Sequence, residues 1–150
     1  MPYDLVFADA LPATVATPYR VTNMPTLLRA MEIVLDQDLA RPRLEDMAGR
    51  VCRRLDLPAP PSASAPGYRA YREEWLRVTA ASRSKRSPNA ARVPAFKFQS
   101  NEDWHVVPEE CEIIADHLEV YATDGVSEAL RRAFAAFNRQ AVAHGGYLVR

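Results

Sequence analysis

The sequence predicts one α+β domain, in which a small antiparallel sheet packs against about five helices. Five segments repeat apolar residues at helical spacing, and short apolar or alternating runs lie near both ends and after position 95. Prolines and glycines separate these segments. A chain of 150 residues is long enough for one shared core, although a break into subdomains at residues 57–67 is an alternative.

The first 22 residues predict two short strands. Residues 3–8 (YDLVFA) are an apolar run suited to an N-terminal strand, and residues 19–22 suit a second. Residues 11–18 contain two prolines and two threonines, which favours a loop. The N-terminal strand is therefore a candidate member of the sheet.

Two amphipathic helices are predicted next. Asn23 is a suitable N-cap, and Pro25 fits the first turn because its missing N–H costs little there. Apolar residues then recur at helical spacing to about Gln37. Pro42 can open the second helix, whose apolar stripe continues to Leu55.

A proline-rich connector separates this helix from the third. Residues 57–67 (LPAPPSASAPG) contain four of the twelve prolines, so they can neither continue a helix nor pair in a sheet. Beyond them, Tyr68, Tyr71 and Trp75 mark one face of a helix that runs to about Ala81.

The C-terminal third predicts a hairpin, two helices and a last strand. The hairpin covers about residues 95–107, with a tight polar turn between its two strands. Pro108 and two glutamates then open the fourth helix, and a fifth ends at a pair of glycines. A terminal strand at residues 147–150 completes the sheet.

Motifs in this last third resemble a group of small bacterial proteins. The shared pattern is Ser100-Asn101 with Trp104, then Pro108-Glu109-Glu110, then a terminal Gly145-Gly146-Tyr147-Leu148-Val149. Val107 stands where the group often has threonine, so a side-chain cap is lost at this helix start. No activity is attached to the group, so the resemblance implies a hairpin–helix–helix–strand unit and no chemistry.

His105 is the strongest chemical candidate, together with Glu109, Glu110 or Asp103. A histidine on a strand beside carboxylates on the next helix could form an acid/base pair or half of a metal site. The structural alternative is that strand alternation places His105 opposite Trp104, while glutamates in a first turn favour the helix dipole. We favour the structural alternative.

Two further groups are candidates for binding. The segment around Arg83, Lys85, Arg86 and Arg92 could contact phosphates or an acidic protein, although a solvated loop is the favoured alternative. The arginines at 50, 53, 54, 69, 72 and 77 would extend such a patch if they fold nearby. The stripe of Tyr68, Tyr71 and Trp75 mixes aromatics with arginines, as interface anchors do, and core packing is the equal alternative.

Composition argues against several classes. Nineteen basic and nineteen acidic residues cancel, which argues against a general nucleic-acid binder. Three histidines without metal-ligand spacing predict no metal and no cofactor. Cys52 and Cys111 lie on apolar helical stripes, which favours buried thiols over a disulfide. With no signal peptide and no apolar run of about 20 residues, we expect a cytoplasmic protein without a membrane partner.

The sequence therefore leans toward a small bacterial protein that is not an enzyme and binds another protein, as an immunity-type, phage-derived or accessory factor does. A homodimer that forms through the aromatic stripe or through an exposed strand edge is also possible. The first alternative is an enzyme with an acid/base site around His105, Glu109 and Glu110. The second is nucleic-acid contact through residues 83–92.

Overall fold

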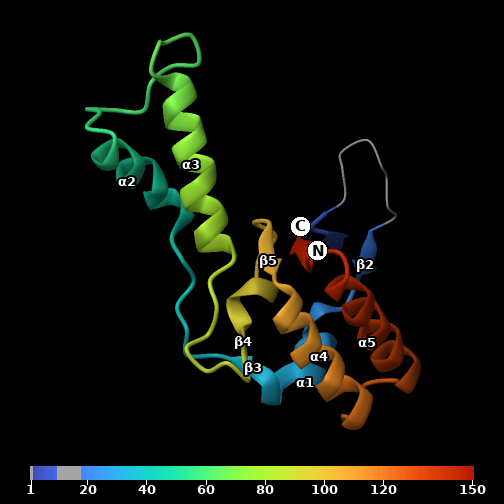
Figure 1. Ribbon diagram of the computed structural model, residues 1–150. Helices are drawn as coiled ribbons and strands as arrows, with labels where there is room; N and C mark the ends of the chain where they lie inside the picture. The colour runs from blue at the N-terminus through green and yellow to red at the C-terminus, as the bar shows by residue number, and fades with distance from the viewer. Residues whose placement is uncertain (1, 10–17) are drawn as a thin grey trace. The chain divides into compact units, whose positions relative to one another are not determined.

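The computed structural model describes residues 2–9 and 18–150, which form an α+β fold in two compact units (Figure 1). Unit 1 comprises Met1–Ala40 and Arg86–Arg150, and unit 2 comprises Arg41–Lys85. The described residues contain five α-helices and a four-stranded antiparallel sheet, which confirms the predicted fold class. The loop predicted at 11–18 falls almost wholly on residues 10–17, outside the described residues.

The sheet of unit 1 joins the two ends of the chain. Its strands β1 (Tyr3–Phe7), β2 (Tyr19–Val21), β5 (Trp104–Val106) and β6 (Tyr147–Val149) lie in the order β2-β1-β6-β5. Leu5 pairs with Val149 on one side of β6, and Trp104 pairs with Val149 on the other. The strands predicted at both ends of the chain are thus confirmed. Alternate side chains of β5 and β6 are fully buried, so this sheet contributes one wall of the core.

The hairpin predicted at 95–107 is wrong. Ala95–Phe98 forms a 3-10 helix, η3, and β5 pairs with β6 instead of with residues 96–99. All four η3 side chains are buried, whereas an edge strand would expose every second one. Just before η3, β4 (Val93–Pro94) pairs in parallel with β3 (Leu35–Asp36), and the sequence patterns did not indicate this small second sheet.

Three helices complete unit 1. α4 (Pro108–Val120) and α5 (Glu128–Val142) lie side by side and share the largest helix–helix contact (Figure 1). α1 (Met24–Met31) packs on α4 and is capped by the predicted Asn23, whose Oδ1 accepts from the Thr26 N–H at 3.2 Å. The first helix is shorter than predicted, because the chain tightens into η1 (Glu32–Val34) before it reaches β3.

Two glycines make the turn between α5 and β6. Gly145 and Gly146 have φ angles of +73° and +82°, which side chains on L-residues rarely allow. A Cβ on Gly146 would lie 2.0 Å from the carbonyl oxygen of Val106. Close approach of β6 to β5 therefore requires glycine at this position.

Unit 2 is a pair of helices. The short η2 (Leu44–Asp46) leads into α2 (Met47–Arg54), and α3 (Tyr68–Arg83) returns antiparallel to it. The proline-rich residues 57–67 join these two helices, so they lie inside unit 2, and the unit boundaries fall near residues 40 and 85. Only four side chains of unit 2 are buried: Met47, Val51, Cys52 and Thr79.

Candidate functional site

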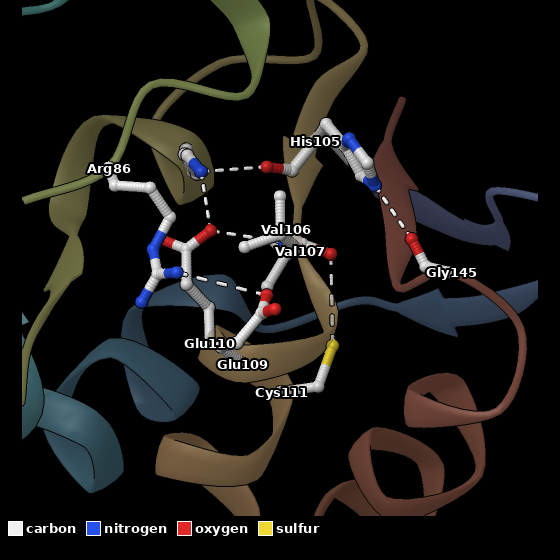
Figure 2. A network of polar contacts seen from close by, with 9 residues as sticks. Arg86, His105, Val106, Val107, Glu109, Glu110, Cys111 and Gly145 are labelled. Carbon is white, nitrogen blue, oxygen red and sulfur yellow. Dashed lines mark hydrogen bonds and ion pairs between the residues drawn. The ribbon is translucent and has the colours of Figure 1, made fainter. Parts of the chain in front are cut away.

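Lys97 and Glu110 form a buried ion pair next to the backbone of His105 (Figure 2). Lys97 from η3 donates to Glu110 Oε1 at 2.6 Å and to the backbone carbonyl of His105 at 2.7 Å. Neither Lys97 nor Glu110 exposes any side-chain surface. Burial lowers the pKa of Lys97 and raises the pKa of Glu110, since desolvation penalises both charged forms more than their attraction favours them.

Glu110 also caps α4. Its Oε1 accepts from the backbone N–H of Val107 at 3.0 Å, which is the glutamate half of a capping box. The valine at the N-cap has no acceptor to return, so the predicted loss of a side-chain cap is confirmed. Glu110 Oε2 is buried without a hydrogen-bond partner. This carboxylate therefore holds η3, β5 and α4 together and is closed to solvent.

The side chains of His105 and the two glutamates point in different directions. His105 Nε2 lies 2.7 Å from the carbonyl oxygen of Gly145, so this nitrogen carries the proton and donates to the glycine turn. Glu109 lies on the other side of β5, where it faces Arg86 at 3.7 Å (Figure 2). Asp103 accepts from Arg150 Nε at 2.7 Å. The structure thus links His105 to Glu110 through Lys97 and the His105 backbone, and not through the imidazole.

Both cysteines are buried free thiols, as predicted. Burial raises the pKa of Cys111 to about 12, and the neighbouring Glu110 adds to this shift. Among residues 2–9 and 18–150, no three His, Cys, Asp or Glu side chains gather closely enough to hold a metal ion. In the same part of the chain, no helix has the length and apolar character needed to cross a membrane.

The basic segment is divided between the units. Arg83 and Lys85 belong to unit 2, where the Arg83 guanidinium lies 6.0 Å from the centre of the Trp75 ring. Arg86 and Arg92 belong to unit 1. There, Arg86 faces Glu109, and Arg92 donates to a backbone carbonyl in β3 at 3.4 Å. Arg83 is the last residue of α3, whereas Lys85, Arg86 and Arg92 lie in the segment between α3 and β4.

Charge is distributed unequally between the units. Unit 2 has ten basic residues, nine arginines and Lys85, against five acidic ones, so its formal charge is +5. Unit 1 has nine basic and fourteen acidic residues, a formal charge of −5. The neutral total therefore conceals one basic and one acidic unit.

The aromatic stripe of α3 is partly core and partly surface. Tyr68, Tyr71 and Trp75 are half-buried, and with Arg72 and Leu76 they line a hollow of about 250 Å³. Desolvation raises the pKa of Tyr71, which faces Cys52 of α2. Leu76 is 48% exposed. One edge of the stripe thus packs on α2 while the other is open to solvent.

Sequence patterns missed a second surface of unit 2, a groove between α2 and α3. Arg54 of α2 and Arg77 of α3 converge on Glu74, at 2.9 Å and 2.6 Å. The Glu74–Arg77 pair could be read from its i, i+3 spacing, but Arg54 reaches it only through the helix packing. Of the three arginines suggested on α2, Arg50 and Arg54 line this groove with Arg77 and Lys85, whereas Arg53 does not.

No family model, curated protein or solved structure matches the chain.

Proposed function

We propose that the protein acts by binding another protein, and that unit 2 provides the binding surface. The observation that carries this proposal is the combination, on one pair of helices, of a +5 charge with an open aromatic hollow. Aromatic and arginine side chains dominate the energy of protein interfaces, so this composition is typical of a binding surface.

The small core of unit 2 supports the same proposal. With four buried side chains, this helix pair has little apolar burial of its own, while Leu76 and the edge of the aromatic stripe stay exposed. A bound partner would remove this apolar surface from water and so stabilise the unit.

An acid/base enzyme centred on His105 has less support. The His105 imidazole donates to a backbone carbonyl, and Glu110 is sealed in an ion pair and a helix cap. Each group has a contact that holds the fold, and catalysis would have to break these contacts. Nucleic-acid contact through residues 83–92 has less support because Arg86 already faces Glu109 and Arg92 already donates to a backbone carbonyl.

The test is affinity capture of the tagged, full-length protein from its own cells, read by quantitative mass spectrometry. Leu76→Glu places a charge in the aromatic hollow at an exposed position, so it should remove the partner without unfolding unit 2. Ile33→Glu is the matched control, because Ile33 is 71% exposed and lies in unit 1.

A stoichiometric protein that is lost from the Leu76→Glu capture and kept in the Ile33→Glu capture supports the proposal. Capture of no stoichiometric protein contradicts it. Equal capture by both variants contradicts the assignment of the surface to unit 2.

A further inference from the structure

The groove between α2 and α3 is lined by both charged and apolar residues. It has a volume of about 520 Å³ and lies wholly within unit 2. Its cationic lining residues are Arg43, Arg50, Arg54, Arg77 and Lys85, and Asp46 is the acidic one. Pro42, Met47, Val78 and Ala81 contribute apolar surface between these charges.

The cations of unit 2 exceed the carboxylates available to them. Glu74 is shared by Arg54 and Arg77, and its hydrogen bond to Arg77 lowers its pKa, so this carboxylate remains ionised and fully engaged. Within unit 2, neither Arg50 nor Lys85 has a carboxylate at ion-pair distance. These two exposed cations of the groove are therefore able to pair with anionic groups of a ligand.

One guanidinium that lines the groove already binds a carboxylate. Arg77 already binds both oxygens of Glu74, through Nε at 3.0 Å and Nη2 at 2.6 Å, in the bidentate arrangement that guanidinium groups form with carboxylates. The apolar lining residues favour a ligand that presents aliphatic side chains next to its acidic groups. A nucleic-acid backbone presents phosphates and sugars and would leave these apolar residues uncovered.

We propose that this groove binds a carboxylate-rich, amphipathic segment of a partner protein. The proposal rests on the proposed function, because it gives the chemistry of the partner that unit 2 binds. Aliphatic side chains of the segment would lie on Val78 and Ala81, and its carboxylates would pair with Arg50 and Lys85.

The experiment measures fluorescence anisotropy of a labelled synthetic helix of about 15 residues with the full-length protein. The peptide has leucines on one face and glutamates elsewhere, and its twin has glutamine at every glutamate. The acidic peptide should bind, its affinity should fall as salt is added, and the glutamine twin should bind at least about fivefold more weakly.

A matched pair of double variants locates the site. Arg50→Gln with Lys85→Gln should weaken binding of the acidic peptide by about fivefold or more, because two exposed ion pairs are lost. Arg53→Gln with Arg69→Gln removes the same charge from exposed positions of α2 and α3 outside the groove, and should have little effect. Far-ultraviolet circular dichroism checks that all four substitutions leave the helices intact.

Three results would overturn the proposal: no binding of the acidic peptide, equal weakening by both double variants, or displacement of the peptide by a single-stranded oligonucleotide that binds more tightly. The groove proposal and the proposed function can fail independently of each other. A cellular partner that depends on Leu76 while the acidic peptide does not bind leaves the proposed function standing and removes the groove. Binding of the acidic peptide without capture of any cellular partner keeps the groove proposal and removes the proposed function.

Discussion

Replacing Glu110 by glutamine should destabilise unit 1 by about 3–5 kcal/mol, because it leaves the Lys97 ammonium buried without its counter-charge. Glutamine can still accept the Val107 N–H, so the helix cap is kept and the ion pair alone is broken. Lys97→Met should lower the free energy of unfolding by a similar amount, since it leaves the Glu110 carboxylate buried without its counter-charge. In a protein of this size, such a loss lowers Tm by about 6–20 °C.

The double variant Lys97→Met with Glu110→Gln is the decisive member of the series. It removes both charges, so it should cost no more than either single variant, and the coupling free energy should be about 3 kcal/mol or more. Urea unfolding followed by tryptophan fluorescence measures all four proteins. A Trp75→Phe background makes the buried Trp104 of unit 1 the only tryptophan.

An exposed ion pair provides the control. Arg20 and Asp4 pair at 2.9 Å with the arginine 63% exposed, so Asp4→Asn should leave the unfolding midpoint nearly unchanged. If each single variant at Lys97 or Glu110 costs less than about 1 kcal/mol, or if the two costs simply add, the pair does not hold η3 to α4 in the way described.

Three further predictions concern the turn, the thiol and the histidine. Gly146→Ala should prevent stable folding because its Cβ would lie 2.0 Å from a backbone oxygen. Gly67→Ala is the control and should be tolerated, because nothing lies within 4 Å of the added Cβ. Soluble yield and circular dichroism compare the two variants, and equal stability would refute the close approach. In a Cys52→Ala background, Cys111 should resist iodoacetamide until the protein unfolds. Folding raises the pKa of the Cys111 thiol from 9.0 to about 12, so above pH 9 the unfolded state releases a proton that the folded state keeps. The free energy of unfolding should therefore fall as the pH rises above 9. A pH-independent unfolding midpoint, or rapid iodoacetamide labelling of the folded protein, would contradict this. His105→Ala should lower the free energy of unfolding in urea by about 0.5–1.5 kcal/mol, because the hydrogen bond to Gly145 is lost. His105→Gln should lower it less, because glutamine can still donate to this carbonyl. Equal losses would show that the hydrogen bond to the glycine turn contributes nothing.

Local signals in the sequence predicted the elements of unit 1 that have local causes. Asn23 caps α1 as its position before Pro25 indicates, and the strand at Tyr147–Val149 follows the glycine pair. The segment 95–98 was misjudged because Phe-Lys-Phe alternation is typical of a strand. A distant partner decides its conformation, since Lys97 must point inward to reach Glu110.

The candidate sites depend even more on tertiary packing. His105 and Glu110 are five positions apart, yet the imidazole reaches Gly145 and the carboxylate reaches Lys97. Arg54 meets Glu74 only because α3 returns antiparallel to α2 across the proline-rich connector. Periodicity identifies each helix, but it contains no information on which helix faces which.

The opposite charges of the two units have a consequence for handling the protein. With a sequence pI of about 6.8, the chain has no net charge near neutral pH, so little long-range repulsion keeps copies apart. The +5 unit of one molecule can instead attract the −5 unit of another. Added salt screens that attraction over about 10 Å, so moderate ionic strength should raise solubility, as in the salting-in of dipolar proteins.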